Sequence, residues 1–264
     1  MIVSEAAGRE GRVVVALGRR ALSVQFRRAQ LLMPTFVLPL MLLAVIASGT
    51  SAAQGLRGFP DVASYLAFVL PGTIVQGALL AGLTSGTALA GDVEFGFFDR
   101  LLAAPVRRTT LVIGRQAGTL GLSVLQTVFF LAVAFAFGAR YPGGVPAILA
   151  TIVLAAITAV GIGGIAGAIA LRTGSVSLLQ SIFPFMFVLL FTAPAFFPRE
   201  LLAPALRDAS VYNPLTYVVE AVRGLLAGDG ALGDPWAGLA AAVALALAAT
   251  ALATLALRER LRTL

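Results

Sequence analysis

The chain has 264 residues, of which 59% are hydrophobic and 12% are charged, whereas a soluble domain carries about 25% charged residues. One core of this size cannot bury so much apolar surface, and this predicts an all-α integral membrane protein. Cys, His and Lys do not occur in the sequence, which excludes disulfides, histidine chemistry and a P-loop ATP site. The net charge is +7, and all of the basic side chains are Arg.

The N-terminal segment, residues 1–30, holds six Arg and no apolar core, so a cleavable signal peptide is not expected. Basic and polar side chains share one helical face of Arg12–Gln30, and apolar side chains share the opposite face. This pattern predicts an amphipathic helix in the membrane interface, with a solvated stem as the alternative.

Six stretches without Asp, Glu or Arg are long enough to cross a bilayer, which takes about 20 apolar residues. They are Leu31–Gly49, Ala63–Ala90, Gln116–Gly138, Ala147–Leu171, Ser175–Phe197 and Trp236–Leu257. We therefore expect six transmembrane helices. Glycine pairs at a spacing of four, such as Gly82 and Gly86, favour close helix packing within the chain over contacts between copies.

The arginines are distributed unevenly among the connections. The segments that six spans would place on the same side as residues 1–30 carry 14 Arg, and those on the other side carry 5. The positive-inside rule then puts both termini in the cytoplasm. Orientation and anionic lipid account for the net positive charge, so no nucleic-acid partner is expected.

The connection Gly91–Arg115 lies on the predicted cytoplasmic side. Phe97, Leu101 and Leu102 form an apolar face beside charged residues, and Pro105 ends the helical pattern. A short helix with one apolar face is a candidate binding site for a protein partner, although a helix that packs under the bundle or on lipid would show the same pattern.

The connection Pro198–Pro235 lies on the predicted outer side. Asn213-Pro214 is a strong helix start and Gly228 a suitable end, which gives about 14 residues with an apolar stripe. Because this length is too short to span, we expect a re-entrant or interfacial helix, with Arg199–Ala209 as a shorter partner helix.

The six stretches contain no ionisable side chain, so an intramembrane protease or an ion-coupled carrier is not expected. We expect no catalytic, metal-binding or cofactor-binding residue in this chain. A neutral bundle with a cytoplasmic docking segment instead predicts an external cytoplasmic ATPase as the source of energy.

Two segments resemble a known family. The run Glu94–Arg108 (EFGFFDRLLAAPVRR), ending in Gly114-Arg115, resembles the cytoplasmic segment of ABC-2 type transporter permeases, most closely the daunorubicin-resistance-type drug exporters. The run Asn213–Leu226 (NPLTYVVEAVRGLL) is similar to the segment before the last span of the same family.

The resemblance implies one transmembrane domain over residues 1–264. Its parts are a cytoplasmic amphipathic segment (1–30), spans one and two (31–90), a cytoplasmic coupling segment (91–115), spans three to five (116–197), an outer helical hairpin (198–235), span six (236–257) and a cytoplasmic tail (258–264). It further implies two permease copies, in a homodimer or heterodimer, and two separate ATP-binding subunits that hold ATP and Mg.

The resemblance also implies roles for individual residues. The residues expected to couple the permease to the ATPase are Glu94, Gly96, Asp99, Arg100, Leu101, Pro105 and Arg107. The residues expected to form the outer gate are Asn213, Pro214, Tyr217, Glu220 and Arg223. The alternatives are that Glu94, Asp99 and Arg100 only solvate a loop, and that Glu220 and Arg223 pair with each other.

The expected substrate is a hydrophobic or amphipathic drug or a lipid-like molecule, because Phe side chains are frequent in Ser175–Phe197 and the four Tyr lie at the ends of spans or outside them. Export of a polysaccharide or lipid-linked glycan is the alternative within the family. A membrane scaffold and a passive facilitator are alternatives of other classes. Arg-only, Ala-rich composition indicates a bacterial genome rich in GC, hence a bacterial inner membrane.

Overall fold

The computed structural model describes residues 11, 15, 16, 18–20, 23, 29–49, 64–98 and 108–262, with the backbone alone at 29–31, 49 and 108–113. This part of the chain is α-helical, without strands. Its helices are α2 (Ala29–Gly49), α3 (Tyr65–Glu94), α5 (Arg108–Ala136), α6 (Gly144–Thr173), α7 (Val176–Phe191), α8 (Pro204–Tyr212), α9 (Pro214–Ala227) and α10 (Pro235–Arg260), with 3₁₀ turns at Arg199–Leu201 and Gly230–Leu232.

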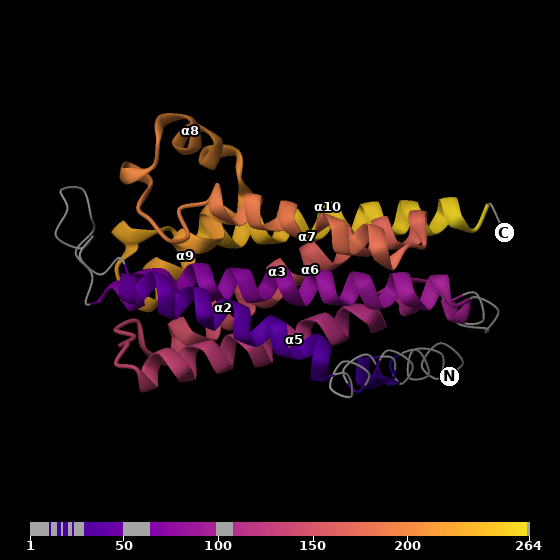
Figure 1. Ribbon diagram of the computed structural model, residues 1–264, viewed down its shortest axis with the longest axis horizontal. Helices are drawn as coiled ribbons and strands as arrows, with labels where there is room; N and C mark the ends of the chain where they lie inside the picture. Colours follow the sequence, from indigo (N-terminus) through magenta and orange to yellow (C-terminus); the bar gives the residue numbers. More distant parts are fainter. Residues whose placement is uncertain are drawn as a thin grey trace, which may run out of the picture.

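The long helices lie side by side, and α3 runs through their centre (Figure 1). We call the end of the bundle where α3 stops the Glu94 end; α6 and α10 also stop there, and α5 and α7 begin there. We call the opposite end, where α9 lies, the Asn213 end. The short helix α8 stands away from the long helices at that end (Figure 1).

Close packing of α3 against α6 depends on glycine. A Cβ atom built on Gly82 would lie 2.7 Å from the backbone nitrogen of Gly163, and one built on Gly86 would collide with the Cβ atom of Ala166. Since no side chain separates the helices at these positions, their backbones come into direct contact. The predicted use of Gly82 and Gly86 in packing within the chain is confirmed.

In the part of the chain that the structure describes, four helices are long and apolar enough to cross a membrane: Tyr65–Glu94, Gly114–Ala136, Gly144–Thr173 and Pro235–Arg260. Two shorter apolar helices are Leu32–Ser48 and Val176–Phe191. Each of the six predicted stretches therefore contains a helix. The helices at the second and third stretches extend into the charged connection, because α3 runs four residues past Ala90 and α5 starts at Arg108.

The fifth predicted stretch, Ser175–Phe197, is wrong as a continuous helix. The helix α7 ends at Phe191, and residues 192–197 form a turn that we call the α7 turn. Pro194 has no amide hydrogen and disfavours helical geometry at Ala193, which favours an end of the helix before this point, although Pro184 is accommodated inside α7. The expected helix at Arg199–Ala209 is also corrected, to a 3₁₀ turn followed by α8.

The predicted N-terminal amphipathic helix lies largely outside the described residues. Gly11, Val15, Ala16, Gly18–Arg20 and Ser23 are helical where the structure describes them. Gly18 is buried against Ala117 of α5, which places this segment beside the start of α5.

Candidate functional site

Charged side chains join four helices in two pairs at the Glu94 end. Arg115 of α5 donates from Nη2 to Oδ2 of Asp92 on α3 at 2.7 Å, and both side chains are about three-quarters buried. Arg172 at the end of α6 forms two hydrogen bonds with Glu259 near the end of α10, at 2.7 and 3.0 Å. Sequence reasoning missed both pairs, although their charges stand directly at the ends of the predicted spans.

Glu94, a predicted coupling residue, binds the start of α7. Its Oε2 atom accepts a hydrogen bond from the backbone amide of Val176 at 3.2 Å. The first amides of a helix have no partner within the helix, and the helix dipole favours an anion there. The carboxylate of Glu94 therefore does more than solvate a loop, because it links the end of α3 to α7.

The chain reverses just after Glu94. Gly96 adopts a positive φ of 69°, which glycine tolerates and other residues rarely adopt. Phe98 is then buried, and the guanidinium of Arg20 lies 4.0 Å from the centre of the Phe97 ring. Gly96 thus allows the turn that follows α3, and its role in coupling to the ATPase stays a prediction. Five other predicted coupling residues, Asp99, Arg100, Leu101, Pro105 and Arg107, lie outside the described residues.

At the Asn213 end, Asn213 joins α7 to α9. Its Oδ1 atom accepts from the amide of Leu215 at 2.9 Å and caps α9, in which Pro214 is the first residue. Its Nδ2 atom donates to the carbonyl of Leu189 at 2.6 Å and to Oγ1 of Thr192 at 2.9 Å. The predicted helix start is confirmed, and the same side chain also satisfies the last turn of α7.

Arg223 of α9 is buried, with 5% of its surface exposed, and it binds backbone carbonyls. Its Nη2 atom donates to Pro194 at 2.8 Å and Ala195 at 3.4 Å, and Nε donates to Phe68 at 3.3 Å. The guanidinium also lies 3.8 Å from the centre of the Phe68 ring. Arg223 thereby ties the α7 turn to α3.

The α7 turn receives one more side chain from α3. The hydroxyl of Tyr65 donates to the carbonyl of Phe196 at 2.9 Å. Gly72 allows this approach, since a Cβ atom there would lie 2.7 Å from the carbonyl oxygen of Ala195. Irregular backbone is stable among apolar helices only when its polar groups are bonded, and here side chains from α3 and α9 supply the donors.

Glu220 does not pair with Arg223, contrary to one interpretation of the sequence. It pairs with Arg199 at 3.1 Å, while Arg223 is occupied by carbonyls. Burial raises the pKa of the Glu220 carboxyl, and the charge of Arg199 opposes that rise. Tyr217, the remaining predicted gate residue, donates to the carbonyl of Val211 at 2.9 Å and thereby holds α8 against α9.

Comparison with known proteins bears on both ends of the bundle. The family model described as ABC-2 type transporter matches residues 12–227, which include the two segments that carry the resemblance. The chain belongs to the ABC-2 type transporter family. With its several apolar helices, this ABC-2 chain is a multi-pass membrane protein and a transport subunit.

Three curated relatives carry the same name, putative transport permease ycf38. The protein from Porphyra purpurea is 30% identical over 212 residues, which cover 80% of this chain and 72% of the relative. The protein from Pyropia yezoensis is 28% identical over the same shares of the two chains. The protein from Cyanophora paradoxa is 30% identical over 162 residues, 61% of this chain and 56% of the relative.

Proposed function

We propose that this ABC-2 chain is the permease subunit of an ATP-driven exporter and that a separate ATP-binding subunit docks on the segment after α3. The observation that carries the proposal is the set of contacts at the Glu94 end. Asp92 binds Arg115 of α5, and Glu94 binds the first turn of α7. A force on the segment after α3 therefore reaches three helices through directly bonded groups. The permease name of the relatives supports the same function.

We propose six spans with both termini in the cytoplasm of a bacterium, so that the Glu94 end faces the ATPase. The 16 residues of α7 reach about 24 Å at 1.5 Å each, less than the roughly 30 Å of a hydrocarbon core. The α7 turn completes the crossing, because its carbonyls are bonded by Tyr65 and Arg223. The 14 residues of α9 reach about 21 Å, which suits a re-entrant helix.

The proposed substrate is hydrophobic or lipid-like. Phenylalanine rings follow one another along α7 and its turn, with centroid distances of 5.1 Å from Phe183 to Phe187, 6.4 Å from Phe187 to Phe191 and 5.3 Å from Phe191 to Phe196. Phe191 is also about half exposed on the surface of the described chain. An aromatic row next to an apolar helix surface suits an acyl chain or an amphipathic drug, and this favours such substrates over glycans.

The first test is purification of the tagged protein from its native membranes in mild detergent, with identification of the bound proteins by mass. We expect an ATP-binding subunit in a one-to-one ratio. In proteoliposomes, hydrophobic or lipid-like compounds should then stimulate ATP turnover, whereas stimulation by glycans alone would replace the substrate proposal. A preparation that never contains an ATPase, even with nucleotide and vanadate, would overturn the exporter proposal.

A charge reversal tests the docking segment. Arg107→Glu with Arg108→Glu should leave membrane insertion intact, because most cytoplasmic arginines remain. It should reduce recovery of the ATPase and substrate-stimulated turnover. The matched control is Arg258→Glu with Arg262→Glu in the tail, which changes the same charge outside the segment. Equal recovery of the ATPase by both variants would remove the docking role.

A further inference from the structure

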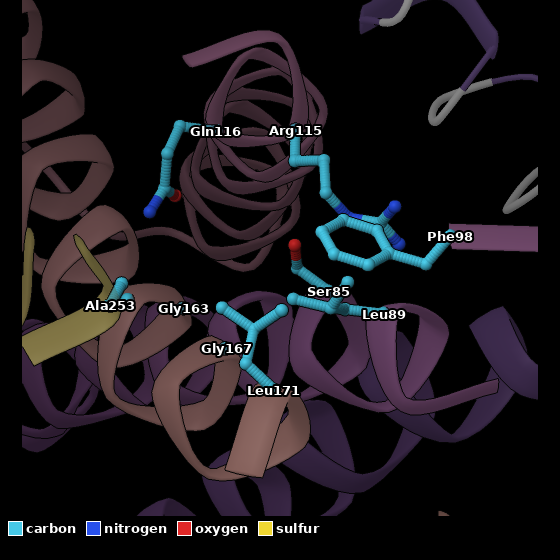
Figure 2. A pocket seen from close by; sticks show the side chains of 10 residues that line it. Ser85, Leu89, Phe98, Arg115, Gln116, Gly163, Gly167, Leu171 and Ala253 are labelled. Carbon is cyan, nitrogen blue, oxygen red and sulfur yellow. The ribbon is translucent and has the colours of Figure 1, made fainter. Parts of the chain in front are cut away.

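A small cavity lies at the Glu94 end between α3, α5, α6 and α10. Its volume is ≈ 40 Å³. Figure 2 shows the hydroxyl of Ser85 reaching toward α5, with Arg115 and Gln116 extending to opposite sides of that helix and Gly163 and Gly167 of α6 on another wall. One water molecule needs on the order of 10–15 Å³ of such space, so the cavity has room for about three.

A stripe of polar side chains continues from this cavity along α5. It consists of Gln116, Thr119, Ser123 and Gln126, and we call it the α5 polar stripe. Spacings of three and four residues place all four on one helix face. A Cβ atom built on Gly163, which lines the cavity, would lie 3.3 Å from Cγ2 of Thr119, so the stripe adjoins the cavity.

Three of the four residues of the stripe are buried and Gln116 is partly exposed, yet oxygens of all four lack partners. Thr119 and Ser123 have 0% of their surface exposed, and Gln126 has 1%. Among the described residues, Gln116 Oε1, Thr119 Oγ1, Ser123 Oγ and Gln126 Oε1 have no hydrogen-bond partner. An unsatisfied buried polar group costs about 1–3 kcal/mol, so four of them on one face call for a ligand that bonds them.

Several other helical hydroxyls of the chain bond to their own backbone, although those of Thr73 and Thr151 do not. Thr84 donates to the carbonyl of Leu80 at 2.8 Å, and Thr158 donates to that of Leu154 at 2.8 Å. Thr119 and Ser123 have the same carbonyls within reach of their own helix, but they form no such bond in the structure. Both hydroxyls are therefore left without a partner in their own helix.

The size and burial of the stripe identify a suitable partner. Thr119 and Ser123 have no exposed surface, so a lipid headgroup, a second copy of the chain or a transported molecule cannot reach them unless the helices separate. We propose that internal water molecules bind in the cavity between Ser85 and Gln116 and continue along α5 to Thr119 and Ser123. Water fits because it both donates and accepts hydrogen bonds and because the cavity holds only a few atoms.

X-ray hydroxyl-radical footprinting tests the cavity on the purified full-length protein in nanodiscs. Radicals formed from bound water label adjacent side chains, so Leu89 and Leu171, which line the cavity, should be labelled severalfold faster than Leu122 and Leu190. All four are buried, with at most 7% exposed, and the last two do not line the cavity. Equal labelling of the two pairs overturns the proposal.

A cavity-filling variant sharpens this test. A Cβ atom on Gly167 would meet only Cδ2 of Leu89, at 3.6 Å, so Gly167→Ala fits without strain and occupies part of the cavity. We expect it to reduce labelling of Leu89 and Leu171 to the rate of the controls. If the faster labelling persists in Gly167→Ala, the radicals come from elsewhere and the proposal fails.

Isosteric apolar variants test the stripe itself. If water bonds Thr119 and Ser123, then Thr119→Val and Ser123→Ala each remove a hydrogen bond and should lower the apparent Tm by about 2–4 °C. The control Thr158→Val removes an equally buried hydroxyl that bonds its own helix. The control therefore shows the fall in Tm that the loss of one buried hydrogen bond causes. A Tm of Thr119→Val and Ser123→Ala equal to or above that of the wild type would mean that the stripe is dry, since removal of an unsatisfied polar group does not destabilise the fold.

Discussion

Replacement of Arg223 by Leu should destabilise the Asn213 end, because it removes hydrogen bonds to three backbone carbonyls. Those of Pro194 and Ala195 in the α7 turn lose their donor, whereas that of Phe68 lies inside α3 and keeps its helical bond. Each buried carbonyl left unbonded costs about 1–3 kcal/mol, and the lost contact with the Phe68 ring adds roughly 0.5–2 kcal/mol. Relief from burying a guanidinium offsets several kcal/mol of this sum.

The net loss in Arg223→Leu should be about 2–4 kcal/mol, which corresponds to a fall in apparent Tm of roughly 5–15 °C. The assay is thermal unfolding in nanodiscs followed by the fluorescence of Trp236, the single Trp of the chain. Arg207→Leu is the matched control, because Arg207 is exposed on α8. If both variants melt at the same temperature, the carbonyl contacts of Arg223 do not hold the α7 turn.

Three further predictions concern other contacts, and each is tested by the apparent Tm of the variants against that of the wild type. Gly86→Ala should lower it by several degrees because the new methyl collides with α6, whereas Gly91→Ala, whose Cβ atom meets only Val176 at 3.7 Å, should not. Asn213→Ala should cost about 1–2 kcal/mol through loss of the α9 cap and of the bond to Leu189, and Asn213→Asp, which keeps only the cap, should fall between. A double-mutant cycle on Asp92→Ala and Arg115→Ala should show a coupling energy of about 0.5–3 kcal/mol, and simple additivity would refute the buried pair.

The sequence predicts the helices of this fold well because they depend on composition over many residues. Each of the six uncharged stretches contains a helix, and the Asn213-Pro214 start and the Gly228 end of α9 are found at the predicted residues. Such signals are local: an Asn side chain caps the helix that follows it, and glycine adopts the positive φ that ends it.

The contacts of the candidate sites could not be predicted in the same way. Hydropathy continues unbroken across Ser175–Phe197, so it gives no sign of the turn after Phe191. The partners of Arg223 are carbonyls, which every residue carries, and they come from positions 155, 29 and 28 residues away. Spacing along one helix suggested Glu220 as its partner, but a three-residue spacing cannot reveal that Arg199 lies closer.

The two ends of the bundle are joined by interactions of different strength. At the Glu94 end, the Arg172–Glu259 pair is about half exposed, and pairs of that kind contribute about 0–1 kcal/mol. At the Asn213 end, buried side chains of Tyr65, Asn213 and Arg223 bond backbone that has no alternative partner, and loss of any of them leaves an unbonded polar group. The ends of α6 and α10 can therefore separate at lower cost than α9 and the α7 turn at the Asn213 end, whereas α3 and α5 stay joined at the Glu94 end by the more buried pair of Asp92 and Arg115.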